Sequence, residues 1–173
     1  MRLFVLAAVM LIAATGASRS DVPSGDGQWI ARLENAGRSL AIANAATGVV
    51  THIRTLESRD HVITRAAALI AVPARRSFLV ALDGVPELWE IALFPDAGPF
   101  HDGFVHSYET GMEESLPAEE GMFARLRIVL DAPVAALEPV AGKRYAVIGT
   151  RIDGTRVEIN LAAKREVAVL PPG

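Results

Sequence analysis

The sequence predicts an all-β fold of short antiparallel strands, and the clearest evidence lies in residues 65–95. Three apolar runs follow one another there, at residues 66–72, 78–82 and 88–93. Each run is too short for a globular helix and is bounded by Pro, Gly or Asp, which is typical of strands. The second and third runs carry bulky, mostly apolar side chains on both faces, which favours a sheet lying between two other sheets.

Three stretches share one pattern, in which a strand, a turn containing Gly or Asp, and a second strand follow one another. They begin at an aromatic residue and span Trp29–Asn44, Phe78–Ile91 and Tyr145–Asn160. The first and third copies end on an Asn, whose side chain can bond the backbone two residues on in a tight turn. A repeat of roughly 40 to 50 residues with paired strands is typical of β-propeller blades. A β-sandwich of ordinary hairpins is the alternative, since strand–turn–strand is the commonest antiparallel unit.

We therefore expect antiparallel, propeller-like blades in an incomplete ring of about three to four. Complete propellers typically use about four to eight blades. An incomplete ring leaves apolar faces and strand edges exposed, which favours pairing with other chains. The sequence accordingly predicts self-association or association with a longer propeller protein. The polar residues 96–121 are expected to form a loop within this array.

Residues 1–17 are predicted to be a secretory signal peptide. Arg2 supplies a positive charge, an apolar run follows, and small side chains precede the expected cleavage site after Ala17. A membrane anchor is the alternative, but the apolar run is too short to span a bilayer comfortably. Residues 18–27 are expected to be a flexible linker and residues 28–173 the blades. This organisation predicts a periplasmic protein with no membrane attachment after cleavage.

Composition excludes several classes of function. The chain has no cysteine, so disulfides and the covalent attachment of a c-type haem through Cys-x-x-Cys-His are ruled out. A non-covalent cofactor is still allowed. The formal net charge of -3, without a basic stripe interleaved with aromatic residues, argues against nucleic-acid binding. The sequence also lacks the motifs of phosphate loops, dinucleotide sites and hydrolase nucleophiles.

Several stretches of the chain carry a resemblance to a known family. They are Gln28–Ile53, Arg65–Ala71, Arg76–Leu82 with Glu87–Ile91, Asp102–His106 and Arg144–Leu161. Residues 28–173 resemble the middle blades of the eight-bladed propeller that binds haem d1 in nitrite reductases carrying haems c and d1, and in related haem d1 proteins. The block at residues 65–91 is the most specific part. The match is collinear with roughly half of one propeller and includes no haem c domain.

The resemblance implies a non-covalently bound haem d1 and no haem c. It also implies arginines that pair with the haem carboxylates, because the planar guanidinium offers a carboxylate two parallel hydrogen bonds. Arg65, at the start of a buried-looking strand, is the first candidate, followed by Arg76 and Arg75. The alternative for Arg75 and Arg76 is that they are solvated turn residues.

Two histidines, His101 and His106, are candidates for the haem pocket, because imidazole can ligate haem iron or donate protons. His106 matches a histidine of the family within the stretch Asp-Gly-x-Val-His. A zinc site formed by His101, Asp102 and His106 is less favoured, because the spacing is not helical and a third strong ligand is missing. His52 and His61 are interpreted as structural.

One departure from the family bears on catalysis. The reductases have a pocket histidine close to the position of Ala135, and alanine cannot deliver the protons that nitrite reduction requires. We therefore expect an exported haem d1-type tetrapyrrole-binding propeller fragment of a denitrification system, not catalytic alone. If it is active, the resemblance implies a nitrite reductase-like oxidoreductase. The alternatives are a non-catalytic periplasmic interaction module made of β-blades and a decayed fragment of a longer reductase.

Overall fold

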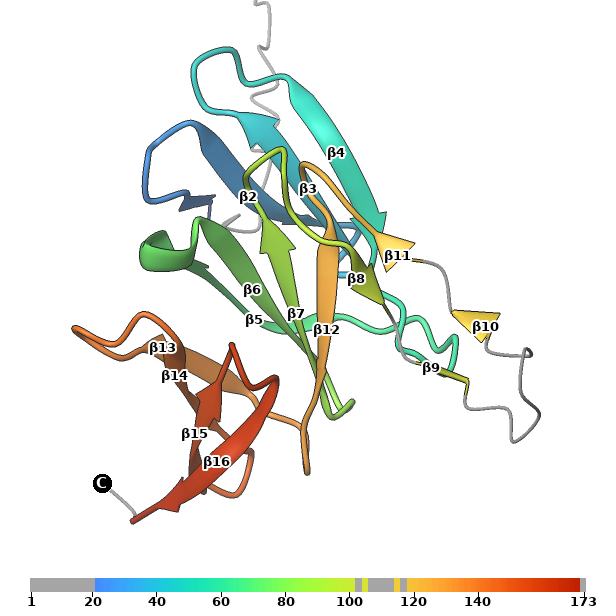
Figure 1. The fold of residues 1–173 in the computed structure, drawn as a ribbon. Coiled ribbons are helices and arrows are strands. Elements are labelled where there is room, and N and C mark those ends of the chain that lie inside the picture. Colours follow the sequence, from blue (N-terminus) through green and yellow to red (C-terminus); the bar gives the residue numbers. More distant parts are fainter. Residues whose placement is uncertain (1–20, 102–103, 106–113, 116–117, 172–173) are drawn as a thin grey trace, which may run out of the picture.

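Three four-stranded antiparallel sheets dominate the fold (Figure 1). The structure is a computed structural model, and it describes residues 21–101, 104–105, 114–115 and 118–171. The sheets follow one another along the chain and stack face to face as blades. This confirms the all-β, blade-like prediction over the alternative of a two-sheet sandwich. The predicted signal peptide lies outside the described residues.

Blade 1 is a meander near the N-terminal end of the described chain. Its strands are β1 (Val22–Pro23), β2 (Trp29–Glu34), β3 (Ser39–Asn44) and β4 (Val50–Thr55). β2 and β3 pair as the first of the three predicted hairpins. Because side chains alternate between the faces of a strand, one face of this sheet is apolar, includes Ala31 and packs against blade 2.

Blade 2 is the central sheet and contains the second predicted hairpin. Its strands are β5 (Ala66–Val72), β6 (Ser77–Leu82), β7 (Glu87–Ala92) and β12 (Arg125–Val129), and the short helix η1 (Pro73–Arg75) joins β5 to β6. Every residue of β6 and β7 is buried. The prediction of a sheet covered on both faces is therefore confirmed.

Blade 3 contains the third predicted hairpin, formed by β14 and β15. Its strands are β13 (Ala136–Pro139), β14 (Ala146–Thr150), β15 (Arg156–Asn160) and β16 (Arg165–Leu170). The outermost strand, β16, is mostly exposed, whereas β14 and β15 consist of buried and half-buried residues. This pattern places one face of the sheet against blade 2.

The first strands of the blades lie together, because β5 contacts both β1 and β13. Neighbouring strands are antiparallel, so the turns that connect them lie alternately at one end of the blade and at the other. We call the end where the chain enters the first strand the entry end, and the other the opposite end. The entry end comprises residues 35–38, 56–65, 83–86, 130–135 and 151–155, and the opposite end includes the turns 24–28, 73–76 and 140–145.

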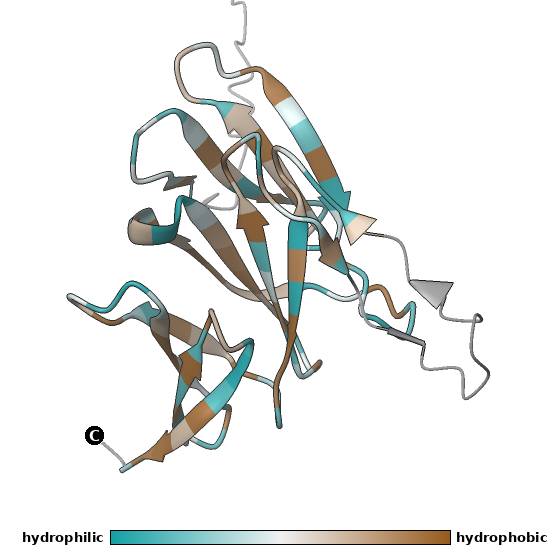
Figure 2. Ribbon diagram, in the orientation of Figure 1, coloured by the Kyte–Doolittle hydropathy of each residue, from teal (hydrophilic) through white to brown (hydrophobic). Residues whose placement is uncertain are grey.

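Two apolar layers hold the blades together. The layer between blades 1 and 2 includes Leu40, Phe78 and Trp89, and the layer between blades 2 and 3 includes Leu88 and Ile159. All five of these side chains are fully buried. Burial of one large apolar side chain contributes about 1.5–3 kcal/mol, so these layers are the main source of stability. Figure 2 shows the hydrophobic colours along β5, β6 and β7, the strands between the two layers.

Individual residues fix the turns and the close approach of strands. The Oδ1 atoms of Asn44 and Asn160 each accept hydrogen bonds from the backbone N–H groups two and three residues on, at 2.9–3.1 Å. This confirms the side-chain bonds predicted for both turns. At Gly149 in β14 there is no space for a side chain, because a Cβ there would lie 2.8 Å from Val134 Cγ1 and 3.0 Å from Ile159 Cδ1.

The linker predicted over residues 18–27 is wrong in its described part. Val22–Pro23 pairs with β2 as an edge strand of blade 1. The Ser24 side chain is buried, donates a hydrogen bond to Asp26 and accepts one from the backbone of Trp29. Because the polar groups of this turn are satisfied within the blade, the segment belongs to the folded sheet rather than to a linker.

The chain between β7 and β12 forms an insertion, residues 93–124, rather than the plain loop predicted for residues 96–121. In it, β8 (Phe100–His101) pairs with β11 (Ala118–Glu119), and β9 (Phe104–Val105) pairs with β10 (Glu114–Ser115). Figure 1 shows β9 and β10 projecting away from the blades, whereas β8 and β11 lie beside β4 and β12. Within the described ranges, no helix is long and apolar enough to cross a membrane.

Candidate functional site

A crevice of about 270 Å³ opens at the entry end, on the boundary between blades 2 and 3. Blade 2 contributes Ala67 from the start of β5, and Asp83 and Gly84 from the turn between β6 and β7. Blade 3 contributes residues 132–135, which precede β13, and residues 151–153 of the turn between β14 and β15. The crevice therefore lies where the first strands of two blades begin.

Most of the crevice wall is apolar, because alanine, proline, valine and isoleucine side chains supply most of its lining. Ile152 is 96% exposed, so its side chain is available to a ligand. The carboxylates of Asp83 and Asp153 also belong to the lining. The backbone N–H of Thr155 donates a hydrogen bond that lowers the pKa of Asp153 below its usual value.

Arg65, the first predicted carboxylate partner, lies beside this crevice. It immediately precedes β5, and its guanidinium approaches the Asp83 carboxylate at 3.4 Å. The two side chains are 60% and 51% exposed, so the pair contributes only about 0–1 kcal/mol. The backbone fixes the local geometry, since the Asp83 N–H donates to the Arg65 carbonyl at 2.8 Å. The guanidinium thus remains available to a ligand carboxylate.

A second arginine, Arg151, lines the crevice but was not predicted from the sequence. One of its terminal nitrogens donates to Glu166 at 2.7 Å, and Glu166 also accepts the backbone N–H of Asp131 at 3.2 Å. The Nε atom of Arg151 is buried and has no hydrogen-bond partner among the described residues. The bond to Glu166 holds the guanidinium in place, so Arg151 is an anchored cation of the crevice wall.

Arg75 and Arg76 lie at the opposite end of β5 from Arg65, so the structure does not bring the three predicted arginines together. The seven residues of β5 separate them, which is about 20 Å of extended chain. Arg75 is not a solvated turn residue, because it makes two hydrogen bonds to the buried carboxylate of Glu90. Arg76 is exposed at the end of the turn, as the alternative interpretation of the sequence expected.

The described histidines do not form a ligand site at the crevice. His101 lies in β8, opposite Ala118, and does not line the crevice. His61 is exposed and bonds Glu57. His106 and Asp102 lie outside the described residues, so the predictions made for them stay predictions. Within the described part of the chain, no group of three or more His, Asp or Glu residues could hold a metal ion.

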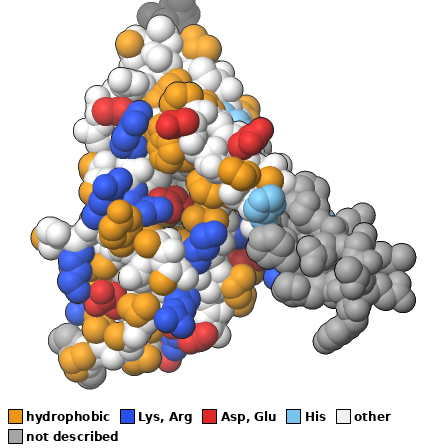
Figure 3. All heavy atoms as spheres, viewed as in Figure 1, with side chains coloured by type: hydrophobic (Ala, Val, Ile, Leu, Met, Phe, Trp, Pro, Cys, Tyr) orange, Lys and Arg blue, Asp and Glu red, His pale blue; other side chains and the backbone are white. Residues whose placement is uncertain are grey.

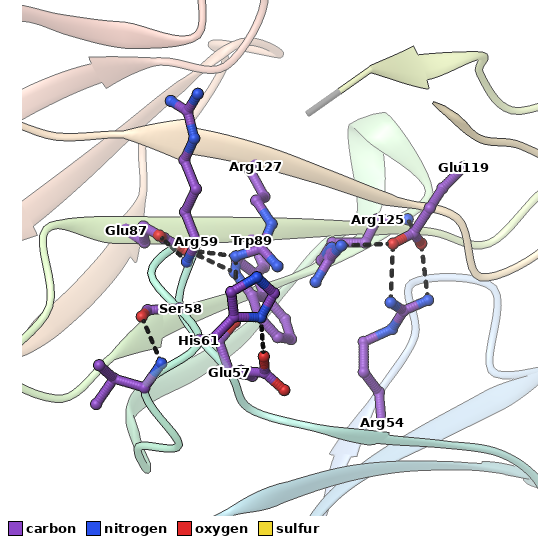
Figure 4. Close-up of polar contacts among 11 residues, drawn as sticks. Arg54, Glu57, Ser58, Arg59, His61, Glu87, Trp89, Glu119, Arg125 and Arg127 are labelled. Carbon is purple, nitrogen blue, oxygen red and sulfur yellow. Dashed lines mark hydrogen bonds and ion pairs between the residues drawn. The ribbon is translucent and has the colours of Figure 1, made fainter. Parts of the chain in front are cut away.

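Sequence reasoning missed a polar cluster on the boundary between blades 1 and 2 (Figure 4). Glu119 of β11 accepts two hydrogen bonds from Arg54 of β4, at 2.9 and 2.7 Å, and pairs with Arg125 of β12 at 2.7 Å. The guanidinium groups of Arg125 and Arg127 lie 4.7 and 5.1 Å from the centre of the Trp89 ring. These contacts tie the insertion and β12 to the outer strand of blade 1.

The same cluster continues around Glu87, a buried carboxylate of β7. Glu87 pairs with Arg127 at 2.8 Å and accepts hydrogen bonds from the Arg59 backbone N–H at 2.6 Å and from Trp89 Nε1 at 3.2 Å. Arg127 also donates to the Glu57 carbonyl at 3.1 Å. Each carboxylate is satisfied internally, so the cluster is a structural tie. The alternation of Arg and apolar residues from Arg125 onwards is the sequence signal that could have indicated it.

Two titratable groups at this boundary have pKa values displaced from their usual range. Burial alone would raise the pKa of Glu119, but the backbone N–H of Arg125 and the guanidiniums of Arg54 and Arg125 hold it below the usual value. The His52 ring stacks on Phe123 with centroids 5.2 Å apart. Burial, and then the nearby Arg54, lower the pKa of His52. His52 is therefore a neutral packing residue at neutral pH, consistent with the structural role predicted for it.

Comparison with known proteins supports the blade assignment. No protein-family model matches the chain, and no curated protein matches it. Among solved structures, the chain is similar to the dihydro-heme d1 dehydrogenase NirN in complex with DHE, with a TM-score of 0.63 and 19% sequence identity. It is also similar to the β-propeller domain of Cps50 (Swd1) from Myceliophteria thermophila, with a TM-score of 0.54 and 16% identity. The chain has the fold of part of a β-propeller.

Both similarities extend over most of this chain and over a minor part of the other. Each covers 87% of this chain, whereas the chain spans 27% of the NirN chain and 38% of the Cps50 chain. One of these proteins is a haem d1 dehydrogenase and the other is a Swd1 propeller domain, so proteins of different function share the fold. At 19% and 16% identity the likeness concerns the fold alone.

Proposed function

We propose that this chain is a periplasmic propeller module that binds a haem d1-type tetrapyrrole non-covalently at its entry end, without reducing nitrite by itself. The observation that carries the proposal is the mainly apolar crevice beside the exposed guanidinium of Arg65. An apolar wall next to a planar cationic donor suits a flat apolar ring system that carries carboxylates. The likeness in fold to a haem d1 dehydrogenase supports the same class of ligand.

The residues of the crevice fit one edge of such a ring. The crevice volume is about 270 Å³, below the roughly 300–1,000 Å³ of pockets that enclose a whole small ligand. Ala67 and residues 132–135 would contact the enclosed edge, and the rest of the ring would remain outside the crevice. Ile152 adds exposed apolar surface at the same place.

Arg65 would pair with a ligand carboxylate in place of Asp83. The existing pair is long and exposed, so little free energy opposes the exchange. A charge-assisted hydrogen bond to a carboxylate contributes about 1.5–3 kcal/mol. Arg151, which donates to Glu166, is a second guanidinium in the crevice wall.

The same residues support a binding role rather than catalysis. When bound, the tetrapyrrole iron supplies redox chemistry whose potential depends on axial ligands and surroundings. No histidine is among the described residues that line the crevice, and Ala135 forms part of the wall. The described residues of the crevice therefore offer apolar contact and charge pairing, and no imidazole ligand or proton donor.

An absorption titration of the purified chain with haem d1 tests this proposal, with light scattering on the same samples. We expect a saturable spectral change whose affinity falls about tenfold or more in Arg65→Ala, because a loss of about 1.4 kcal/mol is tenfold. Arg76→Ala is the matched control, since Arg76 is also exposed but lies at the opposite end of blade 2. A flat titration on a folded monomer, or equal weakening by both substitutions, rejects the proposal.

A second candidate is an interaction module that associates through its blades, with itself or with a longer propeller protein. Ile53 on β4 is 60% exposed and Val169 on β16 is 69% exposed. Each lies on a strand whose outer edge has no partner strand among the described residues. Exposed apolar side chains on an unpaired edge favour strand pairing between chains. Light scattering would then show a mass that rises with concentration while no chromophore binds.

A further inference from the structure

A basic pair recurs at the same turn of two successive blades, at the end opposite the crevice. Arg75 and Arg76 end the turn between β5 and β6, and Lys143 and Arg144 lie in the turn between β13 and β14. Figure 3 shows Lys and Arg side chains along the left of the view, where Figure 1 places η1 and the turn that precedes β14. The whole chain has a net charge of -3, so this positive charge is a local feature.

Aromatic rings support three of these side chains. The guanidinium carbons of Arg75 and Arg144 lie 5.3 and 5.4 Å from the centre of the Tyr145 ring. The guanidinium carbon of Arg76 lies 5.6 Å from the centre of the Phe94 ring. A guanidinium stacked on a ring loses rotamer freedom before any ligand arrives, while its N–H groups can still make paired hydrogen bonds to a carboxylate.

Two of the four cations already have counter-charges. Arg75 donates two hydrogen bonds to Glu90, whose carboxylate also accepts a hydrogen bond from Ser77. Lys143 contacts Glu158 at 3.1 Å. The role of Arg75 is therefore positional, because its anchored guanidinium holds the Tyr145 ring that Arg144 also approaches.

Of these four cations, Arg76 and Arg144 remain without an ion pair among the described residues. Both residues are exposed, and neither has an ion pair within the described part of the chain. The carboxylate of Asp26 is near enough to Arg76 to interact electrostatically, but its hydrogen bonds are to Ser24 and to the Gln28 backbone. Two stacked guanidiniums on neighbouring blades thus make no ion pair or hydrogen bond with a carboxylate of the described residues.

We propose that Arg76, Arg144 and Tyr145 form a docking surface for an acidic segment of a partner protein. Two guanidiniums on separate blades match carboxylates spaced along an extended peptide better than they match one small anion. Tyr145 is 43% exposed and adds an aromatic ring with a hydroxyl group. Arginine and tyrosine are also the residue types most enriched where protein interfaces concentrate their binding energy. The proposal does not depend on tetrapyrrole binding at the entry end.

Fluorescence anisotropy of the full chain with a labelled peptide rich in Glu and Asp tests the proposal. We expect binding that weakens about tenfold or more in the double variant Arg76→Ala with Arg144→Ala, because each lost pair contributes up to about 1 kcal/mol. The double variant with Lys at both positions should lose part of the affinity, since it keeps the charges but not the stacked planar groups. Arg65→Ala, at the entry end, should bind the peptide as the wild type does.

Circular dichroism of each variant confirms that it is folded. Unchanged affinity in the double Ala variant would overturn the proposal. So would equal binding of a peptide in which Gln and Asn replace Glu and Asp. Displacement of the acidic peptide by inorganic phosphate at the same concentration of charge would overturn the assignment to a protein segment.

Discussion

Substitution Glu90→Gln is expected to lower the free energy of unfolding by about 3 kcal/mol. The Glu90 side chain is 6% exposed and accepts two hydrogen bonds from Arg75 and one, at 2.8 Å, from Ser77. Hydrogen bonding to Glu90 raises the pKa of Arg75. The guanidinium still stays charged when the carboxylate is removed, because an arginine is protonated at neutral pH without such a partner. Loss of one partner of a buried pair costs about 3–5 kcal/mol, and Arg75 at 18% exposure falls at the lower end.

Urea unfolding followed by the fluorescence of the two tryptophans measures this loss. The exposed pair of Arg65 and Asp83 is the control, because Asp83→Asn should change stability by no more than about 1 kcal/mol. The double variant Arg75→Leu with Glu90→Leu should recover much of the loss, since apolar replacement of a whole buried pair is often neutral. Stability of Glu90→Gln within about 0.5 kcal/mol of the wild type, or equal losses in Glu90→Gln and Asp83→Asn, would refute the reasoning.

Two further substitutions probe the boundaries between blades. Gly149→Ala should destabilise by about 1–3 kcal/mol, because the new Cβ would lie 2.8 Å from Val134 Cγ1; an unchanged urea midpoint would contradict the packing. The lowered pKa of Glu119 means that its stabilisation is present above the usual value of 4.5 and is lost as pH falls through the lower, folded-state value. In Glu119→Gln the urea midpoint should therefore fall less steeply with decreasing pH than it does in the wild type. Parallel pH profiles for the two proteins would contradict a stabilising role for the ionised Glu119.

The blades could be predicted because the pattern of apolar side chains within a single strand already indicates how that strand is packed. Apolar side chains on both faces of a strand require a neighbouring sheet on each side, and β6 and β7 have both. Two other strands could not be assigned in this way. The edge strand Val22–Pro23 is too short to show a period and contains a proline, and the assignment of β12 depends on β7, across the insertion.

The candidate site was less predictable because it is assembled from distant segments. The place of Arg65 follows from its position at the start of a strand. By contrast, Ala67, residues 132–135 and residues 151–153 meet only because β5 and β13 lie together. The ion pair of Arg75 was missed since Glu90 lies within a mostly apolar run, and its partner depends on the register of β6 and β7.

The insertion of residues 93–124 has a consequence for the order in which the molecule assembles. During synthesis, β5, β6 and β7 emerge well before β12, so blade 2 is a three-stranded sheet with an uncovered edge at β7 until the chain returns. Closing the longer loop costs only about 0.6 kcal/mol for each doubling of its length, but pairing strands so far apart slows folding. A nascent or prematurely terminated chain would leave the Trp89 ring without Arg125 and Arg127, and would be a target for aggregation or for chaperones.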